Sequence, residues 1–227
     1  MGGAVVDSSP MYGRAEDVVG DLVAVLSIRS RLFLATKVWT SGRREGIAGM
    51  QESMRRMRAD PIDLMQVHNL LDTKTHLATM RAWKSEGRIR YIGVTHYTDG
   101  SHEEIGRLVA TEGLDFIQIN YSAAERNAER RLLPLAAERG VAVIANRPLA
   151  SGDLLRHLRG RPLPAWVLEA GCRTWAETLL KFAVSHPAVT CVIPATSNVE
   201  HLRENMRAGE GRYFTGAERE RLVAALY

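Results

Sequence analysis

The chain has 227 residues, of which 45% are hydrophobic and 25% charged, and its formal net charge is +4. This length and balance are typical of a globular protein with a substantial core. The basic residues are spread over predicted helices without interleaved aromatic clusters, which argues against a nucleic-acid partner. No run of about 18 apolar residues occurs and no signal-peptide pattern opens the chain, which argues against membrane insertion and export. Cys172 and Cys191 lack metal or redox spacing, so we expect two buried thiols in a cytoplasmic protein.

Short apolar runs alternate with amphipathic segments along the whole chain. The runs are typical of strands that are buried on both faces. We expect strands over Ala4–Asp7, Leu32–Lys37, Leu64–His68, Tyr91–Thr95, Phe116–Asn120, Ala142–Arg147 and Cys191–Thr196. We expect helices over Ala15–Leu26, Glu45–Arg58, Thr75–Glu86, Ser101–Glu112, Ala128–Arg139, Trp175–Ser185, Val199–Arg207 and Gly216–Leu226. Glycines follow three of these helices as stop signals, and Asn198 stands at an N-cap position.

Repeated strand–helix units indicate parallel strands joined by helical crossovers. A doubly wound dinucleotide-binding sheet should show G-x-G-x-x-G after its first strand, and this chain does not. Polar residues at nearly every strand end favour a (β/α)₈ barrel instead, whose active sites lie at the carboxyl ends of the strands. We therefore predict an α/β, TIM-type barrel over residues 1–227 as one domain, incomplete because only seven strands are recognisable.

Four residues near the ends of the first three predicted strands could form a proton-donating group. Asp7 can neutralise the ammonium of Lys37, which would be costly to bury alone. A phenol beside that ammonium, Tyr12, should have its pKa lowered and could protonate a carbonyl oxygen that His68 holds in line. The chain shows no activated Ser or Cys nucleophile and no metal-binding cluster. For reduction of that carbonyl, the hydride must therefore come from a cofactor.

These motifs resemble those of the aldo-keto reductase superfamily over nearly the whole chain. Residues 7–13, which begin with Asp7 and end with Tyr12 and Gly13, are similar to the family's Asp-x₄-Tyr-Gly element. ATKVW (residues 35–39) is similar to its lysine strand and QVHN (66–69) to its histidine strand. The resemblance implies a TIM barrel that binds a nicotinamide dinucleotide, usually NADPH, without a Rossmann motif. It also implies that Tyr12 is the general acid, that Lys37 and Asp7 form the pair that adjusts the pKa of Tyr12, and that His68 orients the carbonyl.

The resemblance extends to residues that would hold the cofactor. The carboxamide contacts would be Thr95, His96 and Gln118. A further cofactor-binding segment would be Asn146, Arg147, Pro148 and Leu149, in which Asn146 stands where an aromatic residue often stacks on the nicotinamide and Arg147 could instead reach the pyrophosphate. The adenosine-phosphate contacts would be Thr196, Ser197, Glu200, His201 and Asn205. Ala195 and His201 stand where NADPH-specific members often carry a lysine and an arginine. We expect NADP(H) as the cofactor, with NAD(H) as the alternative.

The substrate side is less defined by the sequence. The resemblance places Met11, Trp39 and Asn69 beside the catalytic residues as a pocket for a small carbonyl substrate, and Gly160–Pro164 in a variable substrate loop. Family members carry a strand and a helix before the Asp-bearing strand, so we expect an N-terminally truncated member lacking its first βα unit. Self-association could cover the open barrel edge. Two alternatives remain open: a cofactor-binding regulatory protein with weak or no activity, and a non-redox lyase or isomerase.

Overall fold

The computed structural model describes residues 3–226. Its strands are β1 (Val5–Asp7), β2 (Phe33–Val38), β3 (Ile62–His68), β4 (Ile89–Thr95), β5 (Phe116–Asn120), β6 (Ala142–Asn146) and β7 (Cys191–Val192). Its helices are α1 (Ala15–Leu26), α2 (Arg43–Met57), α3 (Thr73–Ser85), α4 (His102–Thr111), α5 (Leu132–Glu138), α6 (Asp153–His157), α7 (Ala165–Glu169), α8 (Trp175–Val184), α9 (Val199–Arg207) and α10 (Gly216–Leu226). Among the described residues, hydrogen bonds order seven strands from β1 to β7 in chain order, which confirms the predicted α/β class and strand number.

The described residues form two compact units. The N-terminal unit consists of Ala4–His96 and Gly113–Ile117, and the C-terminal unit of Gly3, Tyr97–Glu112 and residues 118–226. The interpretation of the chain as a single domain stays a prediction. Among the helices described, none is both long enough and apolar enough to cross a membrane.

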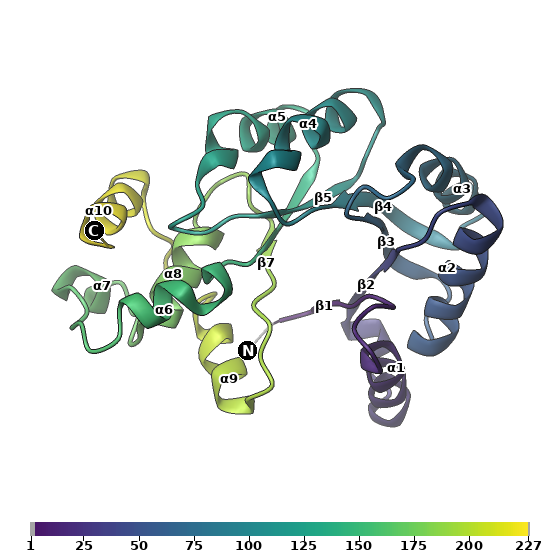
Figure 1. Cartoon of the computed structure of the whole chain (residues 1–227). Helices are drawn as coiled ribbons and strands as arrows, with labels where there is room; N and C mark the ends of the chain where they lie inside the picture. Colours follow the sequence, from purple (N-terminus) through teal and green to yellow (C-terminus); the bar gives the residue numbers. More distant parts are fainter. Residues whose placement is uncertain (1–2, 227) are drawn as a thin grey trace. The chain divides into compact units, whose positions relative to one another are not determined.

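In the N-terminal unit, strands β1 to β4 pair in parallel. The register places Asp7 opposite Ala35, Lys37 opposite Gln66 and His68 opposite Thr95. All seven residues of β3 are buried, as expected for a central strand of a parallel sheet. Helices α2 and α3 lie side by side against these strands, as Figure 1 shows. The parallel pairing brings the carboxyl ends of the strands, which carry the polar residues, to one edge.

Helix α1 packs unusually closely on α2. A Cβ atom on Gly20 of α1 would lie 2.0 Å from the backbone oxygen of Arg56 in α2. Only glycine fits such a close approach of two backbones. Gly20, in the middle of α1, therefore allows the close approach of α1 and α2.

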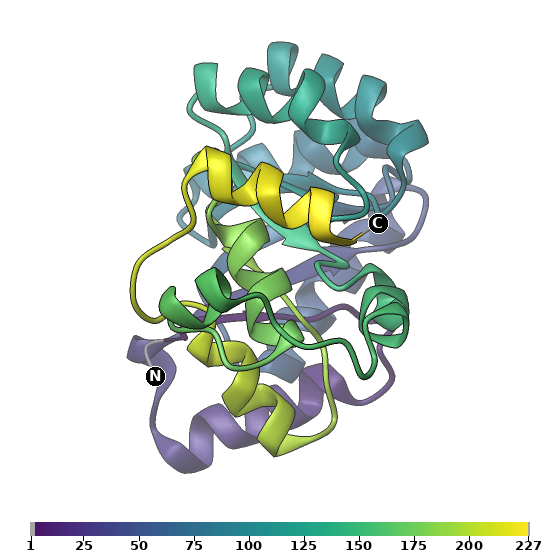
Figure 2. The same cartoon turned by 90° about the vertical axis from the view of Figure 1, so that its left-hand side faces the viewer.

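In the C-terminal unit, β6 and β7 pair in parallel and α8 forms the centre of the packing. Residues 176–183 of α8 are all buried, and α8 contacts both α9 and β7. Arg219 of α10 is also buried and donates to Glu129 Oε1 at 2.5 Å and to the hydroxyl of Tyr121. These charge-assisted bonds hold α10 (yellow in Figure 2) to the rest of the unit.

Three segments differ from the sequence prediction, each for a local reason. The predicted helix over Ala128–Arg139 is wrong as one element, because a 3₁₀ turn at Asn127–Arg130 precedes α5. Pro134 would clash with the carbonyl of Arg130 in a continuous helix, but it fits the first turn of a new one. The last strand ends at Val192 instead of Thr196, since Pro194 has no N–H to donate.

The third difference is the segment between β6 and α8, for which no helix was predicted. It contains two short helices, α6 and α7, drawn in green in Figure 2. The stop signals, by contrast, are confirmed: Gly87, Gly113 and Gly140 have φ values of +77°, +58° and +66°. Asn198 caps α9, because its Oδ1 accepts a hydrogen bond from the Glu200 N–H at 2.8 Å.

Candidate active site and cofactor pocket

Lys37 and Asp7 form a buried ion pair in the N-terminal unit. The Lys37 side chain is 1% exposed, and its Nζ lies 2.5 Å from Asp7 Oδ2 and 2.7 Å from the Ser8 carbonyl oxygen. The other Asp7 oxygen accepts a hydrogen bond from Gln66 Nε2 at 3.2 Å. Burial lowers the pKa of Lys37, and the charge of Asp7 opposes this shift. The pair was predictable from the sequence, whereas Gln66, which lies opposite Lys37 in the strand register, was not predicted.

Tyr12 lies on a turn that follows β1. Its backbone N–H donates to the Ser9 carbonyl at 3.0 Å, and its side chain is 47% exposed. Lys37 Nζ lies 5.2 Å from the centre of the Tyr12 ring. The pKa of Tyr12 is raised, first by burial and then by the charge of Asp7. The expectation of a lowered pKa is therefore wrong, because burial of the hydroxyl, with the charge of Asp7 as the second cause, raises it instead.

His68 ends β3 and is almost fully buried. Its Nδ1 lies 3.1 Å from the hydroxyl oxygen of Ser9, and its ring is 6.1 Å from that of Tyr12 in an edge-on arrangement. Burial lowers the pKa of His68 to about 4, and the nearby Lys37 and His96 add to the shift. A neutral imidazole therefore faces Tyr12 at ordinary pH.

The remaining residues proposed for this end of the site surround His68. The Trp39 ring lies 6.1 Å from the His68 ring, and Trp39 and Met11 are both exposed. Asn69, which follows His68 directly, has a φ of +52°. Such left-handed backbone in a non-glycine residue is often found at functional sites. Thr95, at the end of β4, pairs with His68 in the strand register.

A cavity of about 620 Å³ lies in the C-terminal unit. Six of the predicted cofactor residues line it: Arg147, Pro148, Leu149, Thr196, His201 and Asn205. Three others predicted for the same region do not line it. Asn146 ends β6, Ser197 is exposed, and Glu200 is exposed with its carboxylate paired to Arg203. Gln118 is buried in β5.

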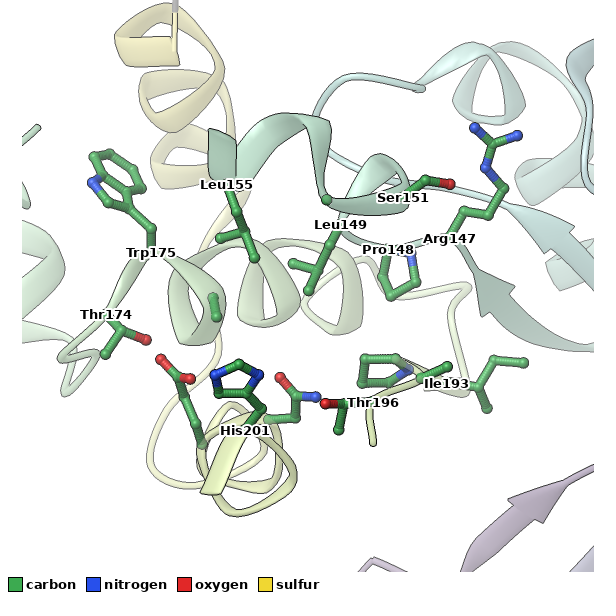
Figure 3. Close-up of a pocket in the computed structure, with 16 residues that line it drawn as sticks. Arg147, Pro148, Leu149, Ser151, Leu155, Thr174, Trp175, Ile193, Thr196 and His201 are labelled. Carbon is green, nitrogen blue, oxygen red and sulfur yellow. The ribbon is translucent and has the colours of Figure 1, made fainter. Parts of the chain in front are cut away.

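The cavity has the chemistry that an anionic dinucleotide requires. Figure 3 shows Pro148 and Leu149 on one side, Thr196 and His201 on the other, and Arg147 at one end. Arg147 carries a guanidinium, which pairs well with phosphate. In Figure 3 it points away from the other lining side chains, and it lies 3.4 Å from the Tyr97 carbonyl oxygen and 3.9 Å from Glu125 Oε1. Two helix N-termini, those of α8 and α9, contribute lining residues and favour negative charge. The residues present therefore fit a nicotinamide dinucleotide phosphate.

Part of this lining was not predicted from the sequence. Trp175 and Thr174 come from the start of α8, and Glu204 lies one turn beyond His201 on α9. A sequence signal did exist for the first two, because Thr174 and Glu177 have the spacing of a capping box. The Thr174 hydroxyl oxygen accepts from the Glu177 N–H at 3.2 Å. Among residues 3–226, no group of three His, Cys, Asp or Glu side chains could hold a metal ion.

Comparisons with known proteins identify related chains. The sequence model of the aldo/keto reductase family matches residues 1–225. Methylglyoxal reductase YeaE from Escherichia coli is 29% identical over 90% of this chain and 74% of its own length.

Solved structures resemble this fold closely. An aldo/keto reductase from Klebsiella pneumoniae, crystallised with NADP and acetate, is 28% identical, with a TM-score of 0.81 over 99% of this chain and 80% of its own. Aldo-keto reductase AKR11C1 from Bacillus halodurans, in its holo form, is 26% identical, with a TM-score of 0.76 over 98% and 81%. These likenesses confirm the barrel-type fold class.

Proposed function

The chain belongs to the aldo/keto reductase family, and we propose that it reduces a small aldehyde or ketone to the alcohol with hydride from NADPH and a proton from Tyr12. It is an NAD(P)H-dependent oxidoreductase by its family and its relatives. The observation that carries the finer proposal is the buried Lys37–Asp7 pair beside the half-exposed Tyr12, with neutral His68 facing the same ring.

Each side chain of this cluster has a separate task in the proposed reaction. When bound, NADPH supplies the hydride that forms the new C–H bond at the carbonyl carbon. The carbonyl π electrons move to the oxygen, and the Tyr12 hydroxyl transfers its proton there. Solvent then restores the Tyr12 proton, so that carbonyl, NADPH and one proton yield alcohol and NADP⁺. The raised pKa of Tyr12 keeps the donor protonated at ordinary pH.

Lys37 and His68 support that proton transfer electrostatically. The Lys37 ammonium, 5.2 Å from the ring centre, stabilises negative charge on Tyr12 after the proton leaves. Asp7 and the Ser8 carbonyl hold the ammonium in place. His68, being neutral, can orient the carbonyl oxygen by a hydrogen bond without competing with Tyr12 as the acid.

The cofactor would be held by residues from the cavity in the C-terminal unit. Arg147 and the N-terminus of α9, with Thr196 and His201, are suited to phosphate groups. Thr95, His96 and Gln118 remain the proposed carboxamide contacts. Complexes of the Klebsiella pneumoniae relatives with NADP and NADPH support NADP(H) as the cofactor.

The test is NADPH oxidation by the purified chain with a panel of small carbonyls. Methylglyoxal comes first, because a relative from Escherichia coli carries that activity in its name. Tyr12→Phe removes only the acid, so we expect kcat to fall by roughly 10²- to 10⁴-fold. The Kd for NADPH, measured by fluorescence, should stay unchanged. NADPH binding without turnover in the unaltered chain would contradict the proposal and favour the regulatory alternative.

A further inference from the structure

Ser9 connects the two residues that act on the carbonyl oxygen in the proposed function. It lies between Asp7 and Tyr12 in the sequence and is fully buried. Its backbone carbonyl accepts from the Tyr12 N–H at 3.0 Å, and its hydroxyl oxygen lies 3.1 Å from His68 Nδ1. One residue thus fixes the turn that carries the acid and also contacts the imidazole.

The hydrogen-bond donors and acceptors around Ser9 determine the direction of its bond to His68. The Met11 backbone N–H, which can only donate, lies 3.4 Å from Ser9 Oγ. Among the described residues, His68 Nδ1 is the other partner of that hydroxyl. If Nδ1 carried the proton, the Ser9 hydroxyl would accept twice and its own buried proton would have no acceptor, which is costly. The favoured arrangement runs from Met11 N–H to Ser9 Oγ, and from Ser9 O–H to Nδ1.

We propose that Ser9 is a positioning residue that holds His68 in the tautomer with its proton on Nε2. Among the described residues, the hydrogen bond seen for the His68 ring is the one at Nδ1, so an N–H on Nε2 is available to a carbonyl oxygen. The opposite tautomer would present a lone pair to that oxygen and repel it. Ser9 therefore determines whether His68 can donate to the substrate. The effect of this tautomer on turnover rests on the proposed function. The tautomer itself does not depend on that function.

The test reads the tautomer directly from ¹⁵N chemical shifts of the imidazole in the cofactor-free chain. The signals of His68 are identified by their loss in His68→Gln. We expect the unaltered chain to hold the proton on Nε2, and Ser9→Ala to show a mixture of tautomers. Ser8→Ala is the matched control, because the neighbouring Ser8 hydroxyl is buried without a hydrogen-bond partner in the described part of the chain. It should leave the His68 signals unchanged.

Kinetics separate this role from a merely structural one. Ser9→Ala should lower kcat/KM for the carbonyl about tenfold, which corresponds to the loss of one ordinary hydrogen bond. The Kd for NADPH should not change, and Ser9→Thr, which keeps the hydroxyl, should restore both kcat/KM and the single tautomer. A proton on Nδ1 in the unaltered chain overturns the proposal whether or not the chain reduces carbonyls. A reductase-negative chain with the proton on Nε2 overturns only the proposed function.

Discussion

The ion pair between Lys37 and Asp7 sets the electrostatics of the candidate active site. Both side chains are nearly inaccessible to water, at 1% and 7% exposure. Breaking such a pair by removing one partner leaves an uncompensated buried charge, which costs about 3–5 kcal/mol. Asp7→Asn should therefore strongly lower the free energy of unfolding, as measured by denaturant titration.

A double variant separates this electrostatic cost from lost packing. Adding Lys37→Met to Asp7→Asn removes the stranded charge and should recover much of the lost stability. If the double variant is less stable than Asp7→Asn alone, the ion pair is not the origin of the effect.

His68 gives a prediction about pH. Its pKa in the folded chain is lowered to about 4, whereas an unperturbed histidine titrates near 6.5. Between these values the unfolded chain binds more protons than the folded chain, so stability falls as the pH drops from 6.5 to 4. The full difference is about 3 kcal/mol.

We expect His68 to titrate near pH 4 by NMR and His68→Gln to flatten the pH dependence of stability in this interval. A His68 midpoint near 6.5, or an unchanged slope in the variant, would contradict the neutral imidazole that the proposed mechanism requires.

Residue-level chemistry was predictable where it depends on the positions of residues along the sequence. It was not predictable where it depends on distances between atoms in the folded chain. The Asp7–Lys37 pair was predictable, because a lysine at the end of an apolar strand requires a counter-charge. The direction of the Tyr12 pKa shift was not predictable, since it depends first on how deeply the fold buries the hydroxyl and then on the distance to Asp7. Ser9 was missed for the same reason, because a lone serine carries no signal until His68 is placed beside it.

Helices were predictable where their apolar periodicity extends over several turns. The bounds of α1 and α9 were predicted to the residue, as long amphipathic segments allow. Helices α6 and α7, of five residues each, were missed, because one turn does not show a period. The lining of the cavity by Trp175 was missed although the start of α8 was predicted, because a helix start does not show which cavity it faces.

Two glycines in neighbouring helices give a matched test of close packing. At Gly20 of α1, an added Cβ would meet the Arg56 backbone oxygen, whereas at Gly49 of α2 nothing lies within 4 Å. Gly20→Ala should therefore destabilise the chain by about 1–3 kcal/mol through overpacking. Gly49→Ala should stabilise it by about 0.5–1 kcal/mol, because alanine loses less entropy in a helix.

Denaturant midpoints of the two variants decide this comparison, since both make the same chemical change in a helix. Equal shifts in the same direction would contradict a close α1–α2 contact. Opposite shifts would support a close contact between α1 and α2 at Gly20.

At the scale of the whole molecule, α1 is apolar on two sides. One side, with Gly20 and Val23, is buried in the N-terminal unit. The other side exposes four apolar residues at helical spacing: Val18, Leu22, Val25 and Leu26. A helix that is apolar all round normally lies buried, and a contiguous exposed apolar surface is typical of an interaction site.

We predict that two copies of the chain associate through this stripe, because the same apolar surface on each copy is self-complementary in a two-fold contact. Light scattering should show a molar mass that rises with protein concentration. Leu22→Lys combined with Val25→Lys should give a monomer, because two ammonium groups would have to lose water in the contact. Leu168→Lys, at another exposed leucine on α7, should leave the association unchanged. A monomeric mass for the unaltered chain at every concentration would contradict self-association, and an equal loss in both variants would contradict the role of α1.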